Sequence, residues 1–522
     1  MLFRSLGIYG LLIAATVYML ITTQQGFIPA QDRGYLIVVI QLPGGASLER
    51  TEQVEHMVEK IALSTPGVRA VPGFIGLSAV TQTLAPNAAT VFPVLTPSNT
   101  RLRKGQSSDW IAAQLRKKLA AIPDAVFVVV APPPISGLGN TSGFAFRLED
   151  RGGLGPHALA KATNDLVAAA NATPGMRNVY TTFNVSSPQV KVDVDHAQAE
   201  MLGVSVHSIN DAIETYFGST YINDFNINGR TYHVTAQADL PFRTSAEALA
   251  RLRVRNSNGD MVPIGNVTSF RDTLGPDRVP RYNLYPASEI SGDTEAGKGS
   301  EFAVKTMEKL AAKVLPPGIY YEWTDLSYQQ TTAGNAGLLV FPLCVAFVYL
   351  VLAALYGSWT LPISILLIVP MCLLAATAGV RIMGLDMSVL TQIGFIVLIG
   401  LAAKNAILIV EFARHLEMRG EERITAVIEA CRLRLRPILM TSFAFILGVV
   451  PLIISDGAGS EMRKAVGTSV FFGMIGVTIF GLIFTPIFYV LVRNLSERGA
   501  HAQAPKPLHQ QEPEGPQERA PA

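Results

Sequence analysis

The sequence predicts a membrane α-helical bundle of six transmembrane helices, joined to a large α+β region outside the membrane. Six apolar stretches are long enough to cross a bilayer, which takes about 20 residues. A polar region, residues 25–335, separates the first stretch from the second and shows the helix and strand patterns of two βαββαβ units. Hydrophobic residues make up 49% of the 522 residues and charged residues only 16%, against about 25% charged residues in an ordinary soluble domain. The six stretches are Leu6–Thr23, Ala336–Tyr356, Leu361–Val380, Met387–Ala413, Pro437–Ser455 and Ala465–Val492.

The first apolar stretch, within residues 1–24, is either a signal peptide or a retained helix. Its apolar run is long, and the sequence Thr22–Gln25 that follows offers no small-residue cleavage site. We therefore expect a retained transmembrane helix, followed by a five-helix bundle over residues 336–496. The tail, residues 497–522, is rich in Pro, Gln and Glu and is expected to be disordered.

The positive charges between the apolar stretches predict the orientation. Segment 414–436 carries six arginines, and Lys and Arg concentrate in cytoplasmic loops. Both termini are then cytoplasmic and residues 25–335 lie outside. Arg463 and Lys464 fall outside and argue against this, but six arginines outweigh two charges. The outer region contains no cysteine, so no disulfide is expected there.

The outer region reads as two ferredoxin-like βαββαβ units with an insertion. Residues 25–135 form the first unit; residues 136–186 and 283–325 form the second; residues 187–282 form an inserted β-rich subdomain. The first unit's elements are expected at Tyr35–Leu42, Leu48–Leu63, Ala70–Gly76, Val91–Leu95, Asp109–Ala121 and Ala125–Ala131. The second unit's are expected at Phe144–Leu148, Pro156–Ala172, Asn178–Phe183, Ser300–Val314 and Tyr320–Trp323.

No cofactor or metal is expected. Gly292–Ser300 (GDTEAGKGS) nearly satisfies the phosphate-binding P-loop, but Gly299 stands where a Ser or Thr must ligate magnesium. We interpret this segment as a Gly-rich turn between a strand and a helix. The eight histidines are scattered, and none has neighbours at metal-ligand spacing. A net charge of +2 predicts no polyanionic partner, which excludes nucleic acid.

Lys404 is the informative residue of the apolar stretches. It lies about ten residues from the arginine cluster, which at 1.5 Å per residue places it roughly 15 Å deep. An unpaired lysine at that depth costs at least about 2.5–3.5 kcal/mol. Asp386 is too far along the chain and Glu411 lies two turns further inward, so neither can be its partner. The needed acid is expected from another polypeptide or from a part of the protein that this chain lacks.

Three segments resemble the resistance–nodulation–division (RND) efflux transporters of the hydrophobe/amphiphile branch. They are Gly400–Ala413 (GLAAKNAILIVEFA), Arg434–Ser442 (RLRPILMTS, with Pro437 expected at a helix start) and Leu355–Pro370. The resemblance covers only the C-terminal half of such a pump, from its seventh to its twelfth helix. It implies a proton relay of Lys404, Arg434 and Thr441 that faces an aspartate pair in the missing N-terminal half.

The resemblance also implies partners, location and substrates. Such pumps are homotrimers of the bacterial inner membrane, and they work with a periplasmic adaptor and an outer-membrane channel. The α/β units would be porter subdomains and the insertion a docking subdomain. The residues matched to the drug pocket are Phe74, Phe92, Phe144, Phe146 and Arg230. Strand phenylalanines can equally be core residues, and both interpretations stay open.

We therefore expect half of a transporter, not an enzyme, that exports hydrophobic and amphiphilic compounds by drug/proton antiport. The alternative is a truncated or split gene product without transport activity of its own, which acts as an assembly partner or an inert remnant. Met1 stands directly before the first apolar stretch, where a full pump would still be in mid-chain.

Overall fold

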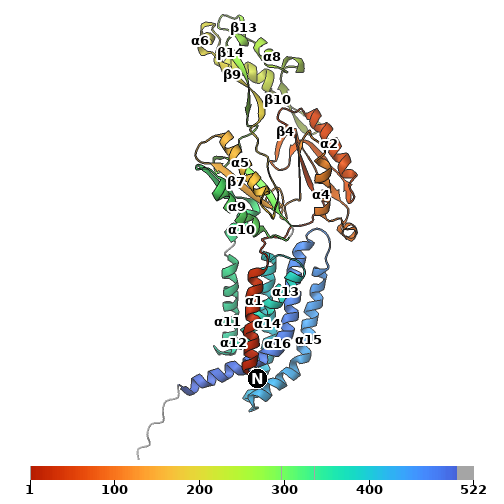
Figure 1. Ribbon diagram of the computed structural model, residues 1–522, viewed down its shortest axis with the longest axis vertical. Coiled ribbons are helices and arrows are strands. Elements are labelled where there is room, and N and C mark those ends of the chain that lie inside the picture. The colour runs from red at the N-terminus through yellow and green to blue at the C-terminus, as the bar shows by residue number, and fades with distance from the viewer. Residues whose placement is uncertain (1, 296, 334–335, 503–522) are drawn as a thin grey trace, which may run out of the picture.

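The computed structural model describes residues 2–295, 297–333 and 336–502. Long helices gather at one end of the molecule, a mixed α/β region lies in the middle, and a smaller β-rich part forms the other end (Figure 1). The expectation that the chain is disordered from residue 497 is wrong for residues 497–502, because α16 continues to Ala502. Residues 503–522 lie outside the described residues.

The first α/β unit is a four-stranded antiparallel sheet with the strand order β3-β4-β1-β6. Alternate residues of β1, such as Val38 and Ile40, are buried against α2 and α4. Both helices start at a serine whose hydroxyl accepts a backbone N–H: Ser47 from Arg50, and Ser107 from Trp110. The elements are β1 (Ile37–Gln41), α2 (Leu48–Leu63), β2 (Val68–Ala70), β3 (Gly73–Ser78), β4 (Thr83–Val91), β5 (Val94–Leu95), α3 (Ser98–Arg101), α4 (Ser108–Leu119) and β6 (Val126–Val130).

The second unit repeats this plan, with the strand order β8-β16-β7-β17. Its strand β16 was not predicted from sequence. The reason lies in its composition: the buried positions of β16 include Ala287, Ser288 and Ser291, so it lacks the large alternating apolar residues that mark a strand. The elements are β7 (Phe144–Asp150), α5 (Pro156–Asn171), β8 (Met176–Thr181), β15 (Arg281–Tyr282), β16 (Tyr285–Thr294), α9 (Ser300–Val314) and β17 (Ile319–Trp323).

The insertion leaves the second unit and returns to it through two paired strands. In this ladder Ser187 of β9 lies opposite Gly275 of β14. A hairpin of β10 and β11 projects from the insertion with most of its side chains exposed. The elements are β9 (Ser187–Val194), α6 (His196–Met201), α7 (Val206–Ile213), β10 (Thr220–Ile227), β11 (Arg230–Ala236), α8 (Ala246–Arg251), β12 (Arg253–Arg255), β13 (Met261–Pro263) and β14 (Thr268–Gly275).

Within the described residues, six helical segments are long and apolar enough to cross a membrane. The third of them is split into α12 and α13. The burial of these segments is uneven: 56% of the apolar window of α14 is buried, but only 11% of the corresponding windows of α1, α11 and α15. The helices are α1 (Leu2–Thr22), α10 (Asp325–Ala333), α11 (Ala336–Tyr356), α12 (Leu361–Leu366), α13 (Val369–Ile382), α14 (Val389–Met418), α15 (Arg423–Ile453) and α16 (Ser460–Ala502).

The prediction that a helix starts near Pro437 is wrong. Helix α15 begins fourteen residues earlier, at Arg423 (437 − 423 = 14), and Pro437 lies inside it. The segment 414–436 is therefore mostly helical rather than a loop. Near the start of α15, the carboxylate of Glu417 on α14 accepts hydrogen bonds from Arg423 Nε (3.1 Å), Arg493 Nη2 (3.1 Å) and Tyr489 Oη (2.5 Å). These contacts join α14, α15 and α16 at one end.

Candidate functional site

Lys404 lies on an exposed face of α14, although its neighbours Ala403 and Asn405 are buried. Its ammonium Nζ lies 5.4 Å from the centroid of the Phe445 ring on α15. In the part of the chain that the structure describes, no carboxylate lies within ion-pair distance of Lys404. The apolar helices therefore present a positive charge on a face that this chain leaves open.

A buried hydrogen bond fixes α14 against α15 beside Lys404. The amide Nδ2 of Asn405 donates to Oγ of Ser442 at 3.2 Å, and both residues are buried. Since Asn405 follows Lys404 and Ser442 follows Thr441, this bond sets the relative height of the two helices where two of the predicted relay residues lie. Sequence reasoning missed the role of Asn405, although an amide in an apolar stretch is itself a signal that a polar partner exists.

Arg434 and Thr441 lie on α15, two turns apart. The guanidinium of Arg434 lies 4.4 Å from the centroid of the Phe412 ring on α14, and its buried Nε has no hydrogen-bond partner among the described residues. The hydroxyl of Thr441 donates to the carbonyl of Ile438 in its own helix at 3.1 Å. The structure thus brings Lys404, Arg434 and Thr441 onto adjacent helices, but within the described ranges no hydrogen bond or ion pair joins any two of them.

Phe74 and Phe92 meet edge to face, with ring centroids 5.7 Å apart. Phe74 lies on β3 and is 52% exposed, so its ring is open to a ligand. Phe92 follows β4 and is half-buried, and its ring also lies 6.4 Å from that of Tyr35. Two of the four predicted phenylalanines therefore form one aromatic patch on the first unit.

Phe144 and Phe146 lie on β7 and belong to the core of the second unit. Phe146 is fully buried, stacked on Tyr321 at 4.9 Å and packed edge to face on Trp323 at 4.8 Å. Phe144 is 4% exposed and also borders a cavity. These contacts are those of core aromatic residues, with Phe144 at the margin of the core.

Arg230 is distant in sequence from the four predicted pocket phenylalanines and, in the described part of the chain, does not contact them. It opens β11 directly after the turn at Asn228 and Gly229, at the exposed end of the hairpin. Among the described residues, no contact joins it to any of the four phenylalanines. The structure therefore separates Arg230 from the other predicted pocket residues within this chain.

A cavity of about 130 Å³ lies where the α/β region meets the long helices. Both apolar and charged side chains line this cavity. One of the charged residues is Asp386, and burial raises the pKa of its carboxyl. Other lining residues are Phe27, Ile28, Phe144, Asp293, Lys298 and Leu326.

Lys298 and Ser300 of the Gly-rich segment line this cavity, and Gly299 and Ser300 contact the chain just beyond the end of α1. A Cβ on Gly299 would lie 2.0 Å from the carbonyl oxygen of Gln25, and the hydroxyl of Ser300 accepts the backbone N–H of Phe27 at 3.1 Å. The glycine thus permits a close contact between two backbones. Its setting agrees with a turn between a strand and a helix.

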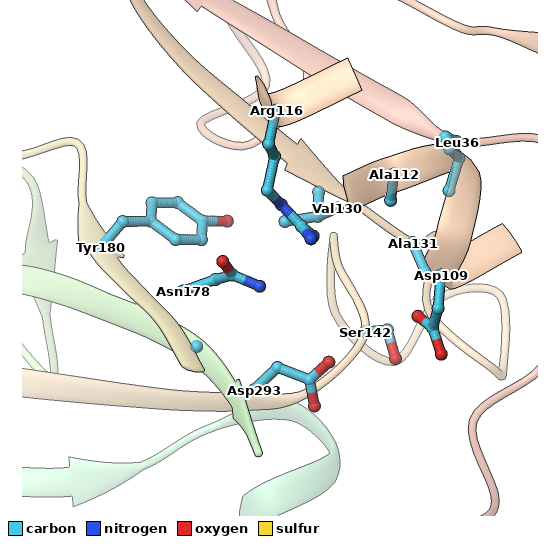
Figure 2. A pocket seen from close by; sticks show the side chains of 11 residues that line it. Leu36, Asp109, Ala112, Arg116, Val130, Ala131, Ser142, Asn178, Tyr180 and Asp293 are labelled. Carbon is cyan, nitrogen blue, oxygen red and sulfur yellow. The ribbon is translucent and has the colours of Figure 1, made fainter. Parts of the chain in front are cut away.

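A smaller cavity of about 30 Å³ lies between the two α/β units and is lined by residues of both (Figure 2). Arg116 of α4 reaches into it from the first unit, and Asn178 and Tyr180 come from β8 of the second. The Arg116 guanidinium donates to the carbonyl of Val129 through Nε at 3.2 Å and Nη2 at 2.7 Å. Burial raises the pKa of Tyr180 to about 12, so its hydroxyl stays protonated. The cavity has room for water rather than for a drug-sized molecule.

Nearly the whole chain is similar to one family of known proteins. Residues 3–493 match the AcrB/AcrD/AcrF family. The chain is 40% identical to the multidrug resistance protein MdtF of Escherichia coli O157:H7 over 502 residues, which is 95% of this chain and 48% of that protein. It is 40% identical to the multidrug export protein AcrF of Escherichia coli K12 over 495 residues, 94% of this chain and 48% of AcrF.

A third relative comes from another genus. The toluene efflux pump membrane transporter TtgB of Pseudomonas putida is 37% identical over 492 residues, 93% of this chain and 46% of TtgB. The chain spans about half the length of the curated relatives it matches. The match over nearly all of the chain shows that this protein belongs to the AcrB/AcrD/AcrF family of RND multidrug efflux transporters.

Proposed function

We propose that this chain is the C-terminal half of a proton-driven exporter of hydrophobic and amphiphilic compounds, with a helix bundle, two porter subdomains and a docking subdomain. The observation that carries the proposal is Lys404, a charge on the open face of an apolar helix with no acid beside it among the described residues. A lysine there needs a partner. An N-terminal half that carries an aspartate pair would supply it and would cover the exposed sides of α14 and α15.

In this proposal the proton switches the pairing of Lys404. When the aspartates are ionised, they hold the ammonium; when one is protonated, that attraction weakens and α14 can shift against its new neighbour. Asn405 and Ser442 would carry the shift to α15, where Arg434 and Thr441 lie. The proton-motive force supplies about 2.3 kcal/mol per charge for each 100 mV and about 1.4 kcal/mol per pH unit.

The substrate would be held outside the helix bundle. Phe74 and Phe92 offer an exposed aromatic patch, and the cavity beside Phe144 combines apolar walls with charged groups. Such a surface suits compounds with an apolar body and a polar head. In the assembled pump we expect a homotrimer of the inner membrane with a periplasmic adaptor and an outer-membrane channel, and Arg230 would meet substrate only if assembly brings it close.

The test is co-expression with an N-terminal half that carries the aspartates. The isolated chain should export nothing, and the pair should lower the accumulation of a fluorescent drug until a protonophore is added. In the pair, Lys404→Ala should abolish export with normal amounts of protein in the membrane. The control is Lys305→Ala, which removes an exposed lysine of α9 whose one ion-pair partner in the described part of the chain is Glu301.

Two results would contradict the proposal: drug export by the isolated chain, or normal export by the Lys404→Ala pair. A pair that assembles but never exports favours the alternative, a split product without transport activity.

A further inference from the structure

Helix α2 carries a group of four ionisable side chains that the transport proposal does not use. We call Glu52, Glu55, His56 and Glu59 the α2 cluster. One atom each from Glu55, His56 and Glu59 lies within 4.8 Å of the other two. The expectation that no histidine has neighbours at metal-ligand spacing is therefore wrong for His56. The signal was the pattern Glu-x-x-Glu-His-x-x-Glu, which places these carboxylates within one turn of the imidazole.

The distances within the α2 cluster suit a tetrahedral metal ion. Nδ1 of His56 lies 3.2 Å from Oε2 of Glu55 and 3.5 Å from Oε2 of Glu59. Ligand atoms about 2.0–2.1 Å from a tetrahedral zinc ion are about 3.3 Å apart. Nε2, on the other side of the ring, lies 3.9 Å from Oε1 of Glu52. A carboxylate that holds the second nitrogen of a ligating histidine is a common feature of zinc sites, and Glu52 would take this place by closing the 3.9 Å separation to hydrogen-bond distance.

Glu55 gives a second reason to expect a positive charge at this place. Its side chain is only 5% exposed, and its carboxylate has no hydrogen-bond or ion-pair partner other than His56 among the described residues. Its Oε1 lies against Gly73, where a Cβ would come within 2.0 Å of that oxygen. A buried carboxylate needs a positive charge or several N–H donors nearby. If His56 carries its proton on Nε2, toward Glu52, then Nδ1 and two carboxylates converge on one point with lone pairs only.

We infer that Glu55, His56 and Glu59 bind a zinc ion, with Glu52 orienting the imidazole and water completing the coordination. The mixed nitrogen and oxygen ligands select zinc over calcium or magnesium, which prefer oxygen alone. Bound zinc would fix α2 beside Gly73, the first residue of β3, and the next residue of β3 is Phe74. The site is independent of Lys404, so each proposal can fail without the other.

The experiment uses the full chain in detergent, stripped of metal with EDTA and titrated with Zn²⁺ by calorimetry at neutral pH. The wild-type protein should bind one more zinc ion per chain than His56→Gln or Glu59→Gln, and a millimolar excess of Ca²⁺ should not compete. Glu52→Gln should keep the site but weaken it about 10-fold. The control is His207→Gln, because His207 is exposed and, among the residues that the structure describes, pairs with Asp211 alone, at 3.3 Å.

Co²⁺ gives a second readout, since a tetrahedral cobalt site with these ligands absorbs in the visible range. His56 and Glu59 are partly exposed, so their variants should keep the wild-type circular dichroism spectrum. Equal zinc stoichiometry in the wild-type, His56→Gln and His207→Gln proteins would overturn the inference. The positive charge between the carboxylates would then be the imidazole proton.

Discussion

Asn405 of α14 donates a buried 3.2 Å hydrogen bond to Ser442 of α15, one residue beyond Lys404 on one helix and one residue beyond Thr441 on the other. A polar contact between two apolar helices fixes their relative height and rotation more narrowly than apolar packing does. We expect this bond to keep Lys404 and Thr441 in a constant relation while the bundle moves.

Removing the Ser442 hydroxyl should weaken the contact between α14 and α15. Ser442→Ala leaves the Asn405 amide without its partner, and we expect a loss of about 1 kcal/mol in stability, the range of hydrogen bonds between membrane helices. Thermal unfolding in detergent measures the loss. The control is Ser455→Ala, because Ser455 lies just beyond the end of α15 and, among the described residues, donates only to the carbonyl of Leu452 in the last turn of that helix, at 2.9 Å. Equal stability of the two variants would show that the Asn405–Ser442 hydrogen bond does not contribute to the free energy of unfolding.

Phe146 should behave as a core residue. Phe146→Ala removes a fully buried ring between Tyr321 and Trp323 and should destabilise the protein by about 3–5 kcal/mol. Urea unfolding followed by tryptophan fluorescence tests this. Phe74→Ala, at an exposed ring, should leave stability unchanged and alter the range of drugs exported by the co-expressed pair. An unchanged unfolding midpoint in Phe146→Ala, with an altered drug range, would instead place Phe146 in the pocket.

Asp325 should make stability depend on pH. It starts α10 with a φ of +54°, and burial raises the pKa of its carboxyl, while Arg147 partly offsets that rise. The folded protein therefore holds this proton more tightly than the unfolded chain. Above the raised pKa the ionised Asp325 carboxylate lowers the stability of the fold. The stability is regained as the pH falls through the raised pKa toward the ordinary pKa of an aspartate, because the carboxyl becomes protonated.

Asp325→Asn has no charge to lose, and asparagine tolerates a positive φ. We expect this variant to be more stable than the wild type at neutral pH and to lose its advantage as the pH falls. The fluorescence of the nearby buried Trp323 follows unfolding at each pH. Asp165→Asn, at an exposed position, is the control and should match the wild type throughout. A pH-independent difference between Asp325→Asn and the wild type would refute the explanation.

The topology can be tested with reporter fusions at two glycine turns. A fusion at Gly229, in the turn of the β10–β11 hairpin, should score outside the cytoplasm, and one at Gly420, between α14 and α15, should score inside. The arginines near Gly420 are the reason for this orientation. A cytoplasmic score at Gly229 would reverse the proposed orientation of the chain.

Sequence predicted best where one strong local pattern acts alone. Helices Leu48–Leu63 and Ser300–Val314 have the predicted bounds, because each combines an amphipathic period with a clear start. Strand β16 was missed because neighbouring strands, not its own small residues, hold it in the sheet. The early start of α15 was missed because its polar first turns look like a loop until packing against α14 and α16 orders them.

The candidate sites divide in the same way. The isolation of Lys404 was inferred from counting acids along the chain, and the origin of its partner stays a prediction. The core position of Phe146 and the distance of Arg230 from the phenylalanines depend on tertiary packing, which a strand pattern does not contain. The α2 cluster was overlooked although its spacing is readable, because exposed acidic side chains on a helix are common without a ligand.

The ladder between β9 and β14 has a consequence for how this part of the molecule can vary. Since Ser187 lies opposite Gly275, the inserted segment starts and ends at adjacent points of the second unit. A segment with adjacent ends can be lengthened, shortened or exchanged without moving the strands that carry it. The β-rich end of the molecule, farthest from the helices, can therefore change in sequence and length independently of the helices.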